Sequence, residues 1–498
     1  MSLLIKSVQI IDGEGKPPRQ ADVFVQRNII AAIGNLKNKD ADEVIDGLGN
    51  YLTPGFIDID TDSDHYLDIF TNPSQNDFTN QGVTTIIGGH CGASLAPLLY
   101  GALEGIEKWA DPSQVNVNWH TMAEFLASLK RVPLGVNFGT LAGHATVRRA
   151  ITNEAERALT RSELAVFKRV LAEALSDGAF GLSTGLGYVQ GRVAREEEIR
   201  ELVKILKSFD GIYATHLRSQ TDRLLPSIKE TIETASGTGV RVLISHLRPL
   251  KGYEDQFSKA LELIKSSAAN ASVHFDIYPH DTSIYPIYAL LPREVQKKNA
   301  AATMEYLNHK EDLKEIEREL RALNPDDIWI AGAPRHEYFV GKTIREIASN
   351  LEVAPAKAIL KIMQTTGLKA TVFYRDINYD LLLQALTDER AFIASNGNSP
   401  PPGKFMKHER STNTFPKFLE FVTKSNALSL EQAIRKITSL PARYFDLKDR
   451  GVVKEGKVAD LVILGKDDLK VRETVVGGKR SSGGNLNRKG AILRHRNR

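Results

Sequence analysis

The sequence predicts an α/β protein built on a closed (β/α)8 barrel, a TIM barrel, with a small β-sandwich formed from both chain termini. Three observations lead to this prediction. The chain has 498 residues, enough for a barrel of roughly 250–400 residues and an accessory domain. Eight short apolar runs alternate with helical patterns in its middle. Both ends alternate apolar and polar residues, which is typical of strands.

The eight apolar runs are the predicted barrel strands. Helical stretches such as 161–178 and 195–211 lie between most of them. Strands that alternate with helices favour a parallel sheet, and eight such units favour closure into a barrel. The runs are residues 56–60, 83–89, 134–143, 179–186, 211–217, 242–247, 272–279 and 391–397.

The domain boundaries follow from the same pattern. We expect the composite β-sandwich to comprise residues 1–52 and 444–498, and the barrel to comprise 53–443. About 110 residues separate the seventh and eighth runs and carry helices and strands of their own, so we expect an insertion over about 285–375. Because the insertion follows a strand end, it is a candidate lid over the site.

Composition and charge exclude several classes of protein. Hydrophobic residues make up 42% and charged residues 25%, which is typical of a globular protein. The net charge is +4, but the last 20 residues carry seven basic residues and no acid, which leaves the remainder at −3. We therefore expect no nucleic-acid partner, and we interpret the basic end as solvated.

The sequence also predicts the compartment. There is no run of 18 apolar residues, so we expect no membrane span, and the short apolar start of the chain does not resemble a signal peptide. The single cysteine, Cys91, excludes an internal disulfide and fits a reducing compartment. We therefore expect a cytoplasmic protein, and we make no prediction of its oligomeric state.

Reactive side chains gather at the predicted strand ends, where barrels of this kind place their active sites. Cys91 follows the second run, and His216 and His246 end the fifth and sixth runs. Each of them alone would fit a buried cysteine or a core histidine. Because a thiolate and two imidazoles are typical zinc ligands, their occurrence at three strand ends predicts a metal site.

A pair of aspartates ends the first run. Asp60 and Asp62 are two residues apart on a strand, so their side chains point to the same side. Two carboxylates facing the barrel mouth repel each other unless a cation or a proton separates them. The alternative interpretation is a solvated acidic strand end.

These motifs resemble those of a known family. The chain is similar to the D-aminoacylase (N-acyl-D-amino-acid deacylase) branch of the amidohydrolase superfamily from about residue 5 to its end, with the motifs in family order at family spacing. They are YLTPGFIDIDTDSD, QGVTTIIGGHCGASLAP, GAFGLSTGLGYVQGRVA, ATHLR, VLISHL, DIYPHDTS, NTFPKFL and SLPARYFDLKDRGVVKEGKVADLVIL.

The resemblance implies a metal-dependent hydrolase of non-peptide amide bonds. Members cleave N-acyl-D-amino acids or related small-molecule amides, with a metal-activated water attacking the amide carbonyl. It also implies one tightly bound zinc ion on Cys91, His216 and His246, here called the Cys-His-His group. Candidates for binding the substrate carboxylate are Arg218, Tyr278, Ser283 and Lys417.

The chain departs from the family at one metal position. Asp60 and Asp62 stand where the family has His-x-His, and Asn396 stands where it has the aspartate that ligates the first metal and shuttles the proton. We call these three residues the first-metal position. Their oxygen atoms favour a harder ion such as Mg²⁺, Mn²⁺ or Ca²⁺. His90 replaces the asparagine that precedes the family's cysteine, and His280 replaces a tyrosine.

These departures leave two functional hypotheses open. An amide cannot act as a base at neutral pH, so a hydrolase would need Asp60, Asp62 or, less favourably, His90 in place of Asn396. The retained Cys-His-His group, together with His144 and Arg218, favours this hydrolase. The alternative is a catalytically silent homologue that binds a ligand or a partner. A single engineered change at Asn396 explains the pattern less well, because the two aspartates accompany it.

Overall fold

The computed structural model describes residues 2–101, 103, 106, 110–267, 271–296, 300–400, 406–481 and 490–495. The chain forms two compact units. The first consists of Met1–Pro279, Asp380–Pro401 and Arg410–Arg498, and the second of His280–Tyr379 and Pro402–Glu409. The second unit therefore extends beyond the predicted insertion of 285–375 at both ends.

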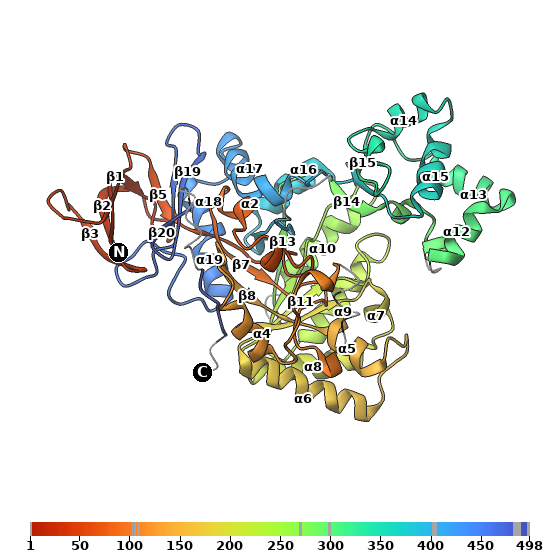
Figure 1. Ribbon diagram of the computed structural model, residues 1–498, viewed down its shortest axis with the longest axis horizontal. Coiled ribbons are helices and arrows are strands. Elements are labelled where there is room, and N and C mark those ends of the chain that lie inside the picture. Colours follow the sequence, from red (N-terminus) through yellow and green to blue (C-terminus); the bar gives the residue numbers. More distant parts are fainter. Residues whose placement is uncertain are drawn as a thin grey trace. The chain divides into compact units, whose positions relative to one another are not determined.

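The barrel lies in the first unit and follows the predicted runs, except that 134–143 forms two short strands. Neighbouring strands pair in parallel, in the orders β6-β7-β8 and β9-β10-β11-β12-β13-β17. Figure 1 labels β7, β8, β11 and β13 among them. The strands are β6 (Phe56–Asp58), β7 (Val83–Gly88), β8 (Asn137–Thr140), β9 (Ala142–Gly143), β10 (Gly181–Gly185), β11 (Ile212–His216), β12 (Arg241–Ile244), β13 (Ser272–Ile277) and β17 (Ala391–Ile393).

The ring closes between the first and last strands. The backbone N–H of Asn396 donates to the carbonyl of Asp60 at 2.8 Å, and the N–H of Asp62 donates to the carbonyl of Gly397 at 2.7 Å. Closure therefore brings the segment after β6 and the segment after β17 side by side, although they are far apart in the sequence.

Helices surround the barrel, and the sequence marks several of their ends. The longest, α6 (Arg161–Asp177), begins with a capping box between Thr160 and Glu163 and ends at Gly178 in the left-handed region. The others are α1 (Asp68–Thr71), α2 (Asn76–Thr79), α4 (Met122–Leu129), α5 (His144–Thr152), α7 (Val189–Arg192), α8 (Glu196–Lys207), α9 (Leu224–Ala235), α10 (Glu254–Ser266), α16 (Tyr379–Thr387), α17 (Arg410–Lys424), α18 (Leu430–Ile437) and α19 (Ser439–Tyr444).

Apolar side chains of several strands form one core cluster. Ile212, Leu243 and Phe392 belong to it with Tyr444 and Phe445, which lie at the end of α19. The predicted site residues lie at or just after the carboxyl ends of the strands.

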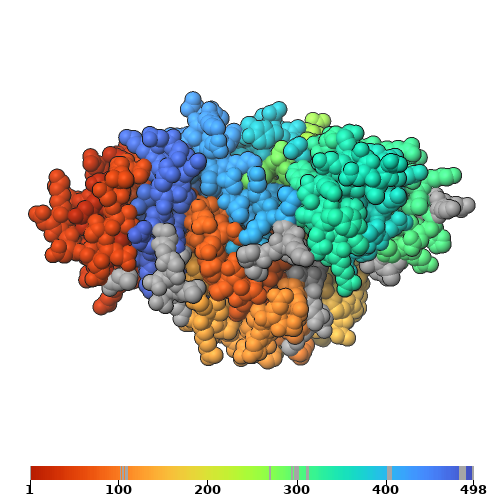
Figure 2. Space-filling model, turned by 45° about the horizontal axis from the view of Figure 1, so that its top comes forward, coloured from red at the N-terminus to blue at the C-terminus, as the bar shows by residue number. Residues whose placement is uncertain are grey.

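Both chain ends contribute to one eight-stranded sheet, whose strand order is β20-β19-β18-β5-β1-β2-β3 with β4 also paired to β1. Figure 2 shows the N-terminal strands, in red, beside the C-terminal ones, in dark blue. Its core contains Leu3, Ile5, Leu52 and Ile463. The strands are β1 (Ser2–Ile10), β2 (Arg19–Gln26), β3 (Ile29–Gly34), β4 (Glu43–Asp46), β5 (Tyr51–Pro54), β18 (Leu461–Leu464), β19 (Val471–Val476) and β20 (Lys479–Arg480).

The end of the chain was predicted to be solvated and to belong to the sandwich, and residues 490–495 do neither. Residues 490–495 lie against the barrel, where the N–H of Phe138 donates to the carbonyl of Ala491 at 3.0 Å. His495 is buried, and its Nε2 lies 2.7 Å from the carbonyl oxygen of Phe209. Backbone pairing and an apolar residue, Leu493, hold this segment in place, and the charge pattern did not reveal them. The basic residues within 482–489 and 496–498 lie outside the described residues.

The second unit has its own sheet and core. β14 (Ser283–Pro286), β16 (Thr371–Tyr374) and β15 (Ile328–Gly332) pair antiparallel in that order. Its helices include α11 (Arg293–Gln296), α12 (Ala300–Asn308), α13 (Lys310–Leu320), α14 (Ile344–Asn350) and α15 (Pro355–Thr366). Among the described residues of both units, none of the helices has the length and apolar character needed to span a membrane.

Candidate metal centre

Cys91 lies in a tight turn that follows β7. Its φ is 54°, and its neighbours Gly89 and Gly92 have φ values of 77° and 78°, so three residues of this turn are left-handed. A Cβ atom on Gly92 would lie 2.7 Å from the backbone nitrogen of Gly185, which only glycine avoids. The turn therefore packs closely on β10 and presents the thiol at the strand ends.

The two histidines come from neighbouring strands. His216 is the last residue of β11, and His246 follows β12 by two residues. These strands pair in parallel with Thr215 beside Ile244, so their ends lie together. His246 has a φ of 37°, an uncommon value for a residue other than glycine. Left-handed backbone at both Cys91 and His246 is the kind of local strain that is concentrated at functional sites.

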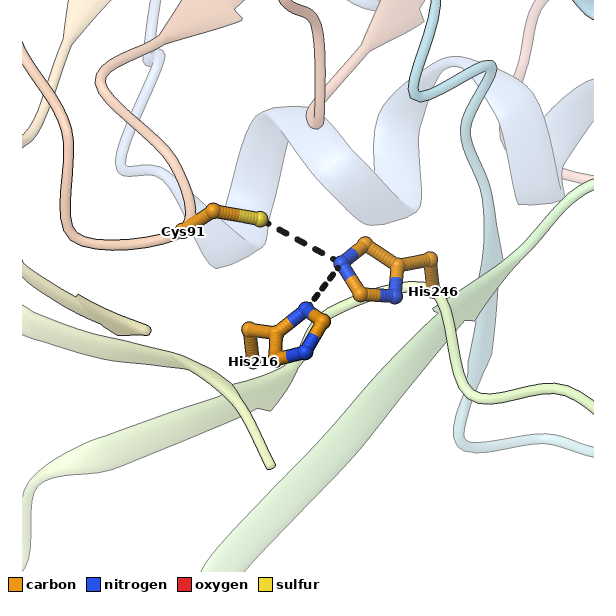
Figure 3. A group of neighbouring side chains, drawn as sticks. All are labelled: Cys91, His216 and His246. Carbon is orange, nitrogen blue, oxygen red and sulfur yellow. Dashed lines mark hydrogen bonds between the residues drawn. The ribbon is translucent and has the colours of Figure 1, made fainter. Parts of the chain in front are cut away.

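The three side chains converge (Figure 3). Nε2 of His246 lies 3.3 Å from Sγ of Cys91 and 3.0 Å from Nδ1 of His216. One donor atom from each residue lies within 4.8 Å of the other two, and no other set of histidine, cysteine or acidic residues in the described part of the chain meets this criterion. Cys91 and His246 are buried, and His216 is half-buried and stacks on Tyr188 at 4.5 Å between ring centroids. The predicted Cys-His-His group is thus assembled.

The surroundings of His246 fit a metal ligand. Its Nδ1 lies 3.2 Å from the side-chain amide of Gln220, and Oε1 of that amide is buried without a hydrogen-bond partner. Turning the amide over would let Oε1 accept a proton from Nδ1–H of His246, since the two ends of an amide group are nearly isosteric. The lone pair on Nε2 would then be directed at a metal, as is usual for ligating histidines.

The protonation of His246 suits a metal ligand. Burial first, and then the neighbours His216, Arg248 and Arg410, keep the pKa of His246 well below its usual value, so the ring is neutral as a ligand must be. Burial, with the charges of Asp60 and Asp62, raises the pKa of the Cys91 thiol well above its usual value. A thiolate at this position therefore needs a bound cation to stabilise it.

The residues of the first-metal position also lie together, in a different arrangement. Nδ2 of Asn396 lies 3.5 Å from Oδ1 of Asp60 and 3.3 Å from Oδ2 of Asp62. The amide therefore presents its N–H groups, and not its oxygen, to the two carboxylates. Burial first, and then the charge of Asp62, raises the pKa of Asp60 to about 7.

Two cationic residues at this position were missed from the sequence. Nδ1 of His65 lies 3.1 Å from Oδ1 of Asp62, and a guanidinium nitrogen of Arg410 lies 3.8 Å from its Oδ2. Burial lowers the pKa of His65, but the carboxylates of Asp64 and Asp62 outweigh it and raise that pKa to about 9. The spacing from Asp62 to His65 was a readable signal, because residues three apart in a turn lie close together. Arg248, near the Cys-His-His group, was also missed, although it lies only two residues after the ligand histidine His246.

His90 does not take the place of a base. Burial lowers its pKa to about 4. Its Nδ1 lies 3.7 Å from Oδ1 of Asp60 and 3.5 Å from the hydroxyl of Ser245. A neutral imidazole with so low a pKa is too weak a base to replace an aspartate near neutral pH.

The four residues predicted to bind the substrate carboxylate have different surroundings in the structure. Arg218 is engaged elsewhere, since it pairs with Glu230 at 2.7 Å and donates to three backbone carbonyls in 191–194. Tyr278 lies under the guanidinium of Arg410, 5.6 Å from its ring centroid. Ser283, in the second unit, donates to Asp376 at 2.7 Å. Lys417 lies on α17 and is half-buried.

His144 has a structural role. Its Nε2 lies 2.8 Å from Oε1 of Glu198, and its ring stacks on Phe167. The same carboxylate accepts a hydrogen bond from the fully buried Arg148. His144 therefore belongs to a buried network between α5 and α8.

Known proteins resemble this chain over almost its whole length. It is 30% identical to the N-acyl-D-aspartate deacylase of Alcaligenes xylosoxydans xylosoxydans over 475 residues, covering 95% of this chain and 86% of that protein. The N-acyl-D-glutamate deacylase of Bordetella bronchiseptica, whose crystal structure contains zinc and a phosphonate inhibitor, superposes with a TM-score of 0.80 at 24% identity, covering 99% of each chain. A D-aminoacylase described with a binuclear metal centre gives a TM-score of 0.79 at 24% identity, again over 99% of each chain.

A family model agrees with these relatives. The model of the amidohydrolase family matches residues 395–482, which include the end of the barrel and the returning strands of the sheet. The barrel fold and the relatives thus agree. The chain belongs to the D-aminoacylase branch of the amidohydrolase family, whose members are metal-dependent hydrolases of amide bonds.

Proposed function

We propose that this protein hydrolyses the amide bond of N-acyl-D-amino acids or closely related amides, with one zinc ion bound by the Cys-His-His group. The assembly of Cys91, His216 and His246 at three strand ends is the observation that carries the proposal. A thiolate and two imidazoles suit zinc and leave a fourth position for water or substrate. The relatives support the substrate class, because they are deacylases of N-acyl-D-amino acids.

The chemistry divides between the metal site and the chain's own residues. A zinc ion bound there would lower the pKa of water and polarise the amide carbonyl. Asp60 is the proposed base in place of Asn396. Its pKa of about 7 suits proton transfer near neutral pH, and its Oδ2 is buried without a hydrogen-bond partner. Asp62 is the weaker candidate, because His65 and Arg410 already pair with it.

Positive charge at the metal centre supports an anionic substrate. Burial lowers the pKa of His246 most, and His216, Arg248 and Arg410 lower it further. We propose that Arg248 attracts the carboxylate of the substrate. The substrate contacts of Tyr278, Ser283 and Lys417 stay predictions, and the pairing of Arg218 with Glu230 assigns it to the protein framework.

The alternative of a silent homologue is disfavoured. A barrel kept only as a binding scaffold has no need of a neutral imidazole, a buried thiol and a second imidazole at hydrogen-bonding distance. Asn396 stands where the family has an aspartate, so one acid–base group is missing, and such a group is typically worth about 10²–10⁴ in rate. That loss predicts a slower hydrolase and does not by itself abolish the reaction.

The test is a substrate screen with metal analysis on the same preparations. We expect the zinc-loaded protein to release free amino acid from N-acetyl-D-amino acids and not from their L-enantiomers. His216→Ala should lose the metal and at least about 10²-fold in rate, as expected when catalysis depends on a bound ion. His120→Ala, at an exposed histidine, should match the wild type. A fully zinc-loaded protein that hydrolyses no acylated amino acid would refute the proposal.

A further inference from the structure

The first-metal position already contains positive charge from the chain itself. Asp62 is flanked by His65 at 3.1 Å on one carboxylate oxygen and by Arg410 at 3.8 Å on the other. The guanidinium of Arg410 stays charged at all relevant pH values. The carboxylate that would attract a divalent ion is therefore paired with a cation from α17, whose first residue is Arg410.

In the third residue of this position, the two neighbouring carboxylates favour the amide orientation that turns the nitrogen, and not the oxygen, toward them. A metal needs the carbonyl oxygen of Asn396, since an amide nitrogen has no available lone pair. The amide nitrogen is the atom that faces Asp60 and Asp62, at 3.5 Å and 3.3 Å. Its hydrogens satisfy the carboxylates without an ion. Within the described residues, Asp60 and Asp62 join no group of three converging histidine, cysteine or acidic ligands.

Arg410 is held in place by more than Asp62. Its guanidinium lies over the ring of Tyr278, 5.6 Å from the centroid, and its side chain is 13% exposed. A guanidinium that stacks on an aromatic ring and pairs with a carboxylate in a mostly buried place is already ordered before any ligand binds. Arg410 is therefore a fixed part of the first-metal position.

We infer that Arg410 replaces the second metal ion of a binuclear centre, so that this chain binds one divalent ion, at the Cys-His-His group, and no second ion at Asp60, Asp62 and Asn396. The inference deepens the proposed function and rests on it for the first ion. Arg410 balances the charge of Asp62 but offers no open coordination position. Excess divalent metal therefore has no second site to fill near the reacting groups.

Metal stoichiometry tests this inference without an activity assay. The purified protein is titrated with Zn²⁺ and separately with Mn²⁺, and bound metal is measured by elemental analysis after gel filtration. We expect the wild type to bind one equivalent of Zn²⁺ and no more than one equivalent of Mn²⁺. We expect Cys91→Ala to bind no metal. We expect Arg410→Met to gain Mn²⁺ binding, because Oδ2 of Asp62 then lacks its cationic partner and only His65, on Oδ1, still pairs with that carboxylate. Arg345→Met removes a surface arginine paired with Asp326 and should keep the wild-type stoichiometry.

The outcomes separate the inference from the proposed function. Two equivalents on the wild type, metal retained by Cys91→Ala, or no gain of Mn²⁺ by a folded Arg410→Met would each overturn the inference and leave the hydrolase proposal standing. No metal on the wild type would overturn the proposed function, and the inference with it. Should Arg410→Met fail to fold, the wild-type and Cys91→Ala titrations still decide.

Discussion

The side-chain amide of Gln220 lies 3.2 Å from Nδ1 of His246, the ring nitrogen opposite the one that faces Cys91 and His216. Gln220 is itself buried, so water does not replace it easily. A partner at Nδ1 fixes both the orientation of the imidazole and the tautomer that leaves Nε2 free to ligate. Gln220 is thus a positioning residue of the metal centre.

Removal of Gln220 should weaken metal binding. We expect Gln220→Ala to lower zinc affinity by about 10–100-fold, the usual cost of losing such an outer partner. Gln220→Glu should keep the affinity, because a carboxylate also accepts from Nδ1–H. Competition with a chromophoric chelator measures both. Gln432→Ala, at the exposed start of α18, serves as the control. Equal zinc affinity in Gln220→Ala and wild type would exclude the positioning role.

The buried network beside α8 should matter for stability. Glu198→Ala leaves the guanidinium of Arg148, which is fully buried, without its carboxylate partner. Breaking a buried ion pair from one side costs about 3–5 kcal/mol in free energy of unfolding. Glu201→Ala on the same helix removes exposed pairs with Lys168 and Lys204, worth about 0.2–1 kcal/mol each.

Chemical denaturation of both variants measures this difference. A loss below about 1 kcal/mol for Glu198→Ala would mean that the buried charge of Arg148 finds water or another partner. Its other partners are the amide oxygen of Gln190 at 2.9 Å and the backbone carbonyl of Arg157. Neither carries a formal negative charge, so we expect no compensation.

The Cys-His-His group could be predicted because its signal is local. Each ligand directly follows or ends an apolar run, and parallel strands bring their carboxyl ends together whatever the details of the loops. The barrel strands were predictable for the same reason, since each is a short apolar run with helical pattern on either side. The same local pattern places Asp60 at the end of the first strand.

The partners of those residues were harder to predict. Arg410 reaches Asp62 from a helix after the last strand, and no local pattern links them. Arg218 directly follows a strand that ends in a ligand, yet the glutamate at position 230, one helix later, takes up its charge. Strand ends position the backbone, whereas charge pairing between distant segments decides what each long side chain contacts.

The ion pair of Asp62 and His65 should make stability depend on pH. The pKa of His65 is about 9 in the folded protein against an ordinary value of 6.5, so protonation favours the folded state. This contribution is complete below pH 6.5 and is lost as the pH rises through about 9. Because a tenfold change in proton affinity is worth about 1.4 kcal/mol, we expect a loss of about 3 kcal/mol across that window.

Urea unfolding of the metal-free protein at several pH values measures this loss. Compared with wild type, His65→Gln should show less change in stability between about pH 6.5 and 9, because the side chain at position 65 no longer titrates. His120→Gln, at an exposed histidine, should follow the wild type. Parallel pH profiles for wild type and His65→Gln would show that His65 is not charged in the folded state.

The close approach of β10 to the Cys91 turn should make one glycine indispensable to metal binding. A Cβ atom on Gly185 would lie 2.2 Å from the carbonyl oxygen of Cys91 and 2.6 Å from Cδ2 of Tyr188, which stacks on His216. Backbone cannot yield as a flexible side chain does, so Gly185→Ala should displace Cys91 and cost about 1–3 kcal/mol of stability. We expect at least about a tenfold loss of zinc affinity, since ligand geometry is shifted.

Gly34→Ala, with no atom within 4 Å of the added Cβ, is the matched control and should bind zinc as the wild type does. If Gly185→Ala keeps wild-type zinc affinity, the turn must shift without moving the thiol, and the rigid contact between β10 and Cys91 would have no part in building the metal centre.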